Sequence, residues 1–144
     1  MKTDDTFAKV SELYYSYDNY LRAKMVKNNL GNLMTSHGRI LVALKFDGDM
    51  TMSEMSNKIH KQPQTTTTLV KKLVAYKYIE IYSLKDKRVK YLKLTDKGRE
   101  VTDTILDISG ELYQTQYKGI SEEEVTCFRG ILKTIMENLK EGED

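Results

Sequence analysis

The spacing of hydrophobic and polar positions predicts a chain built mostly from amphipathic helices. In residues 5–27, apolar side chains recur every three or four positions, which places them on one face of a helix. That face carries Phe7, Val10, Leu13, Tyr14, Tyr17, Tyr20 and Leu21. Gly31 and its asparagine neighbours suit a left-handed cap after this helix. A second helix is expected over residues 36–46, with Ile40, Leu41, Ala43 and Leu44 buried.

Residues 51–75 have the pattern of a helix-turn-helix unit. Thr51 and Glu54 predict a capping box, in which the threonine hydroxyl accepts from the Glu54 amide and the carboxylate reaches back to the backbone. The short helix that follows turns Met55 and Ile59 inward. Pro63 then suits the first turn of a longer helix, because that position needs no backbone N–H. The apolar face of the longer helix carries Leu69, Val70, Leu73 and Val74.

A basic two-stranded wing is expected after this unit. Residues 79–82 and 89–94 have the composition and alternation of strands, and the polar turn between them carries Lys85, Lys87 and Arg88. Two helices follow, the first capped by Thr95 and the second by a capping box of Ser121 and Glu124. Their apolar sets are Val101, Ile105, Ile108 and Leu112 in the first, and Val125, Phe128, Leu132, Ile135 and Leu139 in the second.

The expected fold class is therefore mainly α with a small β-wing. A length of 144 residues suits one domain. Within it, we expect a winged helix-turn-helix lobe at residues 35–99 and dimerisation helices at residues 1–34 and 100–144. No apolar run approaches the length of a membrane span and the N-terminus lacks a signal-peptide core, so a cytoplasmic protein without a membrane partner is expected.

Charge is divided unevenly along the chain. The formal net charge is only +2, yet residues 58–99 carry 12 Lys and Arg against 3 Asp and Glu, a local charge of +9. Residues 100–144 carry 4 cations and 11 anions. This asymmetry is typical of a nucleic-acid-facing module joined to a module that does not face nucleic acid. The alternative is a solvated surface on which lysines happen to cluster.

The long amphipathic helices at the two ends need a surface on which to bury their apolar faces. Pairing with a second copy of the chain is the simplest solution, and it would place two reading helices along one duplex. The alternative is a monomer in which the end helices fold back on the core.

The middle of the chain resembles the MarR/SlyA family of winged-helix transcription regulators. The wing residues Asp86, Lys87 and Arg88 match the family pattern D-x-R, and Leu92 to Gly98 match the following L-x-L-T-x-x-G. The specific match covers residues 51–98, and the order and length of the helices extend it over nearly the whole chain. The resemblance implies a homodimer that binds a pseudo-palindromic operator in double-stranded DNA and most often represses transcription.

Two kinds of DNA contact follow from the resemblance. Arg88 would enter the minor groove, oriented by Asp86, although Asp86 could also serve only as a turn-capping carboxylate. The other candidate DNA-binding residues are Gln62, Gln64, Thr65, Thr66, Thr67 and Thr68 for the major groove, and Lys71, Lys72, Lys87 and Lys90 for phosphates.

The recognition helix departs from the family in one respect. Many relatives carry Arg where this chain has Thr68, so Gln64 and the threonine methyl groups are expected to favour A·T pairs. The alternative for the four threonines is helix capping and a polar surface.

Members of the family commonly bind small phenolic or other amphipathic effectors between the dimerisation helices and the DNA-binding lobe. Tyr14, Tyr17, His37 and Arg39 are the candidates for such a site, and ordinary core packing with a hydrogen-bonded histidine is the favoured alternative. Cys127, the single cysteine, is expected to be a small buried side chain rather than a redox sensor. With two histidines in the chain, a zinc site is not expected.

Two other functional classes are alternatives to a DNA-binding regulator. The sequence contains no nucleophile elbow, phosphate-binding loop, paired catalytic carboxylates or metal motif, so neither an enzyme nor a bound cofactor is expected. A winged-helix module that docks an acidic protein partner through its basic face is the stronger alternative. A preference among DNA duplexes would separate the two, since a protein-docking module has no reason to choose among them.

Overall fold

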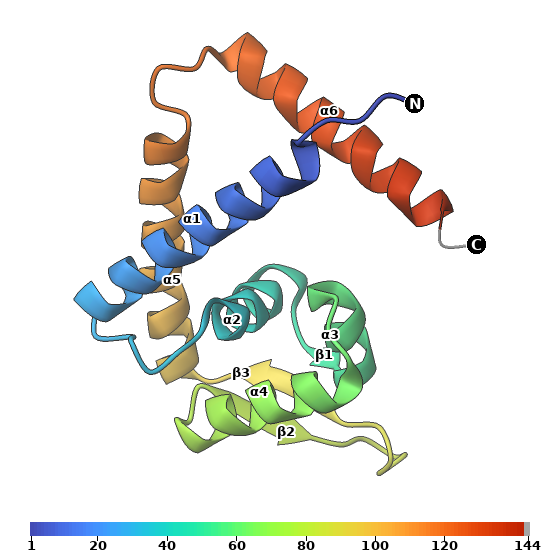
Figure 1. Cartoon of the computed structure of the whole chain (residues 1–144). Helices are drawn as coiled ribbons and strands as arrows, with labels where there is room; N and C mark the ends of the chain where they lie inside the picture. Colours follow the sequence, from blue (N-terminus) through green and yellow to red (C-terminus); the bar gives the residue numbers. More distant parts are fainter. Residues whose placement is uncertain (143–144) are drawn as a thin grey trace. The chain divides into compact units, whose positions relative to one another are not determined.

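The computed structural model describes residues 1–142 and forms six helices and three strands within them (Figure 1). The helices are α1 (Thr6–Lys27), α2 (Thr35–Asp47), α3 (Met52–Ile59), α4 (Pro63–Ala75), α5 (Asp96–Gln116) and α6 (Glu122–Glu141). The strands are β1 (Met50–Thr51), β2 (Ile79–Tyr82) and β3 (Tyr91–Leu94). The predicted fold class, mainly α with a small β-wing, is confirmed. None of the helices formed by residues 1–142 combines the length and the hydrophobicity that a bilayer crossing requires.

The chain forms two compact units, and the boundary between them falls inside α5 at residues 109 and 110. The first unit contains α1 to α4, the sheet and the first turns of α5. The second begins at Gly110 and contains the end of α5 together with α6. The proposed division into dimerisation helices and a DNA-binding lobe stays a prediction.

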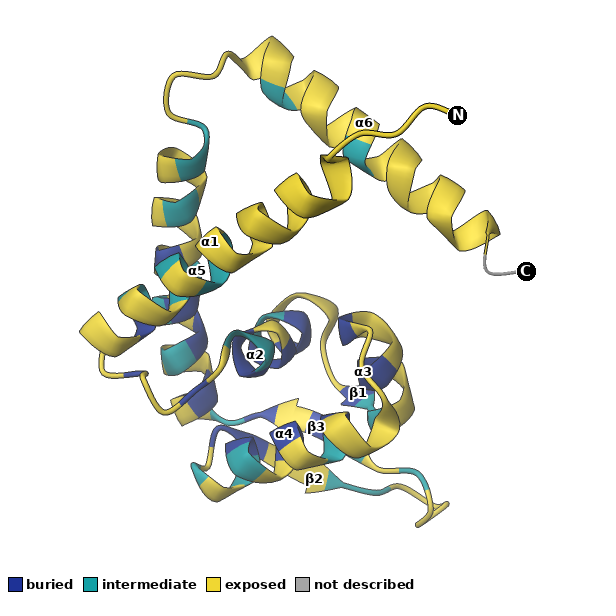
Figure 2. Cartoon of the chain, in the orientation of Figure 1, coloured by how far each residue is buried: buried dark blue, intermediate teal, exposed yellow. Residues whose placement is uncertain are grey.

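The core of the first unit lies between the sheet and the helices α2, α3 and α4. The sheet is antiparallel in the order β1-β3-β2, with Met50 opposite Leu92 and Ile79 opposite Leu94. α2 contacts β3 and α4 contacts β2, so the buried faces of both helices meet the sheet. Figure 2 shows buried residues on the inner faces of these elements. The largest fully buried side chains include Ile40, Leu41, Met55, Ile59, Leu73, Ile79 and Leu92.

The junction between α3 and α4 follows the predicted helix-turn-helix plan with one correction. The Thr51 hydroxyl accepts from the Glu54 amide at 3.1 Å, as expected for an N-cap. The Glu54 carboxylate, however, accepts from the Thr51 hydroxyl at 3.0 Å instead of reaching back to the backbone, so the expected reciprocal box is wrong. Both groups stay satisfied because the hydroxyl donates and accepts at once. His60, in the left-handed conformation with φ 55°, ends α3.

The start of α5 explains the L-x-L-T-x-x-G pattern in physical terms. The Thr95 hydroxyl donates to the Lys77 carbonyl at 2.6 Å and accepts from the Gly98 amide at 3.0 Å. A Cβ at position 98 would lie 2.0 Å from the Tyr78 carbonyl oxygen, so only glycine fits. Thr95 and Gly98 therefore hold the first turn of α5 directly against the segment that leads into β2. β3 itself begins at Tyr91, two residues later than the predicted strand, because Val89 closes the wing turn by donating to the Asp86 carbonyl at 3.2 Å.

His37 caps α2 in place of a conventional capping residue. Its Nδ1 atom accepts from the Met34 backbone N–H at 2.9 Å, and the side chain is 2% exposed. Burial, reinforced by the positive charge of Lys72, lowers the pKa of His37 below its ordinary value. The neutral imidazole therefore performs the role that a carboxylate has in a capping box.

The second unit leaves the apolar face of α6 uncovered. The capping box of Ser121 and Glu124 is present in full, with both reciprocal hydrogen bonds. No residue of α6 is buried, and Figure 2 shows the helix almost entirely in the exposed colour. Cys127 is exposed, so the expectation of a buried cysteine is wrong for the single chain. The reason is that Cys127 lies on α6, which has no buried residue.

Candidate nucleic-acid interface

α4 turns a polar face outward because its apolar face is fixed in the core. Leu69, Val70 and Leu73 are buried against the first unit, so the positions between them point to solvent. The exposed side chains at the start of this face are those of Gln62, Gln64, Thr65 and Thr68, and Lys71 follows one turn later. Gln62 is the N-cap, and Pro63 begins the helix as its position in the sequence predicts.

Two threonines of α4, Thr67 and Thr68, use their hydroxyl hydrogens within the helix. Thr67 donates to the Pro63 carbonyl at 2.9 Å and Thr68 donates to the Gln64 carbonyl at 3.1 Å. While those bonds hold, each hydroxyl offers a partner only its lone pairs, and each side chain also offers a methyl group. Such a surface suits the amino groups of adenine or cytosine and the methyl group of thymine.

Thr66 lies in the core and not on the polar face. Its side chain is 0% exposed, and its hydroxyl accepts from the Ser56 hydroxyl at 2.9 Å and donates to the Gln62 carbonyl at 3.2 Å. A duplex could not reach this hydroxyl without unpacking α4 from α3. We therefore correct the expected DNA contact of Thr66 to a packing role, in which it fixes the register of the two helices.

The wing presents an arginine fork oriented by a carboxylate. Arg88 Nε donates to Asp86 Oδ1 at 3.1 Å, and its terminal nitrogen donates to Oδ2 at 3.2 Å. The Arg88 backbone N–H donates to the same carboxylate at 3.0 Å. Asp86 therefore both caps the turn and orients the guanidinium. These hydrogen bonds lower the pKa of Asp86, which keeps the carboxylate charged. The Arg88 side chain is 91% exposed.

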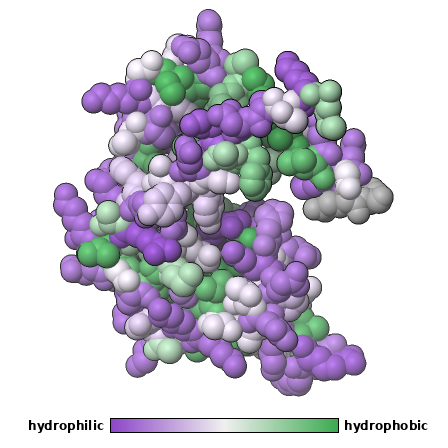
Figure 3. Space-filling view, viewed as in Figure 1, coloured by the Kyte–Doolittle hydropathy of each residue, from purple (hydrophilic) through white to green (hydrophobic). Residues whose placement is uncertain are grey.

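The other cations of the interface differ in how freely they are presented. Lys71, Lys87 and Lys90 are exposed, and Lys90 Nζ lies 3.4 Å from the Ser83 hydroxyl. Lys72 is only partly exposed, and its charge acts on the buried His37, so it is the least accessible of the expected phosphate contacts. Hydrophilic side chains dominate the wing turn at the lower right of the space-filling view (Figure 3).

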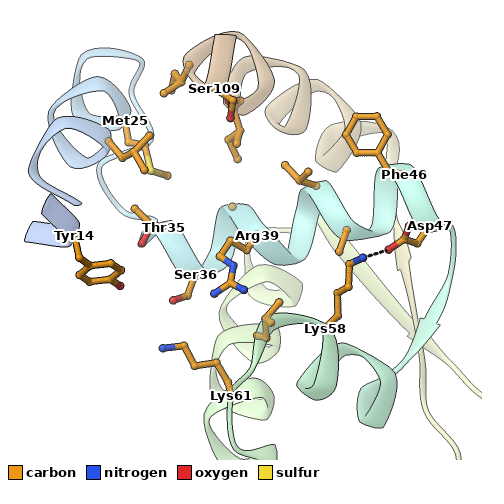
Figure 4. A pocket seen from close by; sticks show the side chains of 17 residues that line it. Tyr14, Met25, Thr35, Ser36, Arg39, Phe46, Asp47, Lys58, Lys61 and Ser109 are labelled. Carbon is orange, nitrogen blue, oxygen red and sulfur yellow. Dashed lines mark hydrogen bonds and ion pairs between the residues drawn. The ribbon is translucent and has the colours of Figure 1, made fainter. Parts of the chain in front are cut away.

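A cavity of about 670 Å³ lies within the first unit. α1 contributes Tyr14, Leu21 and Met25, α2 contributes Arg39 and its neighbours, and α5 contributes Ile105, Ile108 and Ser109. Of the four candidate effector-binding residues, Tyr14 and Arg39 line this cavity (Figure 4). Tyr17 and His37 are not part of its lining, and the hydrogen-bonded, buried His37 matches the alternative of ordinary packing.

The charged groups of the cavity are mainly cationic. Lys58 Nζ pairs with Asp47 Oδ2 at 3.0 Å, while Arg39 and Lys61 extend toward the open space between α1 and α3 (Figure 4). Lys58 and Lys61 were absent from the sequence-based candidates for this site. The sequence could have indicated them, because Lys58 and Lys61 lie on either side of Ile59, which is predicted to face inward. Among residues 1–142, no group of three or more His, Cys, Asp or Glu side chains is placed to hold a metal ion.

Comparison with known proteins links this architecture to transcription regulators. No protein-family model matches the sequence. The transcriptional repressor IacR of Pseudomonas putida is 25% identical over 103 residues, which is 71% of this chain and 62% of that protein. An uncharacterized HTH-type regulator of Bacillus subtilis, YsmB, is 24% identical over 94 residues, covering 65% of this chain and 64% of that protein. The matches therefore span less than two thirds of either relative.

A solved structure decides the fold. A MarR protein from Peptoclostridium difficile superposes with a TM-score of 0.87 over 99% of this chain and 92% of that chain, at 20% identity. This chain has the MarR fold. The resemblance drawn from the wing and from Leu92 to Gly98 is confirmed.

Proposed function

We propose that this chain is a homodimeric, sequence-specific, double-stranded DNA-binding transcription regulator. The observation that carries the proposal is the pairing of two exposed elements on one lobe, the polar face of α4 and the wing with its oriented Arg88. α4 would lie in the major groove, where Gln64, Thr65 and Thr68 contact base edges. Arg88 would enter the minor groove, and Lys71, Lys87 and Lys90 would contact phosphates.

Dimerisation is proposed from the apolar faces that the single chain leaves exposed. Phe7 in α1 is 85% exposed and Leu139 in α6 is 69% exposed, which is unusual for such large apolar side chains in a monomer. A second copy would cover these faces and would bring a second α4 to the duplex. A dimer of this kind reads an inverted repeat, so the operator is expected to be pseudo-palindromic.

Control by a small molecule is proposed from the cavity of the first unit. Its walls are mostly apolar, while Arg39, Lys58 and Lys61 supply positive charge, so the cavity suits a small amphipathic effector with an anionic group. Because the cavity is lined by both α1 and α3, an effector bound there would act on the helix that packs against α4. The proposed result is a repressor that releases its operator when the effector binds.

Selection from a random pool of duplexes at near-physiological salt tests the proposed function. We expect enrichment of an inverted repeat, with A·T pairs favoured where α4 and the wing make contact. An unsorted pool whose retention disappears as salt rises would leave only a basic surface. In that event the wing and α4 would be assigned to docking an acidic protein partner, and an acidic peptide array would be the next probe.

A further inference from the structure

Two cavities meet the short connection between α3 and α4. The first is the cavity described above, which α3 lines through Lys58 and Ile59. The second is a polar groove of about 570 Å³ at the start of α4. The groove is lined by Met52, Ser53, Ser56, Asn57, His60, Lys61, Gln62, Pro63 and Thr67. Lys61 lines both.

The backbone at Lys61 is fixed, which leaves only its side chain to choose between the two cavities. The Lys61 amide donates to the Ser56 carbonyl at 3.1 Å, and His60 before it is in the left-handed conformation that closes a helix. Gln62 after it is already the N-cap of α4. The Lys61 side chain therefore starts from a fixed backbone position, and its four flexible methylene groups allow the ammonium to reach either cavity.

The charge around Lys61 leaves its ammonium available to an anion. The neighbouring Lys58 is paired with Asp47 at 3.0 Å, whereas no carboxylate of residues 1–142 forms an ion pair with Lys61. Asp47 is the one acidic side chain in the lining of the first cavity, and the lining of the groove has none. An anion that enters the groove therefore meets Lys61 without a carboxylate in the lining, and in the first cavity the Asp47 carboxylate is paired with Lys58.

We propose that Lys61 is a shared cation that binds a DNA phosphate through the groove and an aromatic carboxylate through the cavity, one at a time. This inference rests on the proposed function, since it explains how the effector site and the operator site are coupled. A single ammonium that improves binding at both sites cannot serve both at once, so each ligand weakens the other. Thermodynamic linkage makes that effect reciprocal.

The test uses 1-naphthoate as the aromatic carboxylate and the selected duplex as the DNA ligand. Duplex affinity is measured by fluorescence anisotropy with and without 1-naphthoate, over a series of salt concentrations. We expect 1-naphthoate to weaken duplex binding by the wild-type chain about 5-fold or more, the lower end of ordinary coupling. In Lys61→Gln, the salt slope should fall by about one and the effect of 1-naphthoate should disappear. Lys61→Arg should restore both.

Two matched variants distinguish a cation that serves both sites from one that serves only the DNA or only the cavity. Lys71→Gln removes a phosphate contact away from the cavity, so it should lower the salt slope and keep the full effect of 1-naphthoate. Lys58→Gln changes a cation that lines only the cavity, so it should leave the salt slope unchanged. Thermal unfolding of each variant checks that the exposed substitutions leave the fold intact.

Two results would overturn the shared-cation proposal while leaving DNA recognition in place. One is a Lys61→Gln variant that retains the wild-type response to 1-naphthoate. The other is a wild-type chain whose duplex affinity does not change when 1-naphthoate is added. Failure of the proposed function is read separately, before any 1-naphthoate is added, as a wild-type chain that shows no preference among duplexes. The shared-cation proposal would then fall with it.

Discussion

α4 and α6 have the same kind of amphipathic pattern and opposite surroundings. α4 buries Leu69, Val70 and Leu73 between α3 and the sheet. α6 buries no residue, although its pattern is at least as regular. Its exposed apolar side chains are Phe128, Ile131, Ile135, Met136 and Leu139. Periodicity therefore predicts which face of a helix is apolar, and it says nothing about what covers that face.

The difference between the two helices has a thermodynamic meaning. Burial of the α4 face occurs when one chain folds, so its contribution to stability does not depend on protein concentration. Burial of the α6 face, if a second chain provides it, is gained only on association and rises with protein concentration. Substitutions in the two helices should therefore be distinguishable by dilution.

Leu73→Ala should have the largest effect on the folding of a single chain. Leu73 is fully buried in α4, so its truncation leaves a cavity and lowers the free energy of unfolding by about 2–5 kcal/mol. Urea denaturation at two protein concentrations measures it, and the loss should be the same at both. Ile131→Ala on the exposed face of α6 is the matched control, and its loss should shrink on dilution, because Ile131 is exposed once the copies dissociate. If the two losses depended on protein concentration in the same way, the proposed difference between α4 and α6 would be wrong.

Ile135→Glu should separate the two copies of the chain. A carboxylate in the middle of the α6 apolar face would have to be buried in the dimer, which costs at least about 2.7 kcal/mol and weakens association at least about 100-fold. Analytical ultracentrifugation measures the dissociation constant. Thr134→Glu adds the same charge one position away and off the apolar face, so it should leave association nearly unchanged. A dimer that survives Ile135→Glu would show that this face is not the interface.

Arg88→Ala should damage DNA binding and leave the dimer intact. Loss of the wing guanidinium is expected to weaken operator binding by about 1–3 kcal/mol. Anisotropy with the selected duplex measures the affinity, and ultracentrifugation checks association. Because the Arg88 side chain is 91% exposed and pairs with the neighbouring Asp86, the folding of the lobe should not change. An unchanged operator affinity would remove the minor-groove role proposed for Arg88.

The local signals of this sequence were sufficient to predict most of the fold. The spacing of apolar residues located all six helices of residues 1–142 to within a few positions, and Pro63 marked the start of α4 correctly. These features depend on neighbours along the chain, which a sequence displays directly. The alternation of side chains continues back to Val89 and so predicts a start of β3 that is two residues too early. In the structure, the Val89 backbone N–H closes the wing turn instead of pairing in the sheet.

The features that were missed depend on contacts between distant segments. In the sequence, Thr66 is as good a candidate for the polar face as Thr65. Only the packing of α4 against Ser56 places the Thr66 side chain in the core. Met34 is a poor capping residue by type, so the cap that His37 provides to α2 could not be read from position 34. The requirement for Gly98 was visible as a pattern, while its cause, the Tyr78 carbonyl oxygen, lies in another element.

His37 should give the lobe a pH dependence that α6 does not share. Because burial and the charge of Lys72 lower its pKa in the folded state, the unfolded chain binds a proton at His37 more readily. Stability is therefore complete above the ordinary value of about 6.5 and falls as the pH drops below it, by at most about 1.4 kcal/mol per pH unit. Urea unfolding at pH 7.5 and 5.5 measures this loss. It should be reduced in His37→Asn and retained in His60→Asn, whose histidine is exposed. If the loss belongs to the lobe, it should also persist in Ile135→Glu, where the two copies are apart.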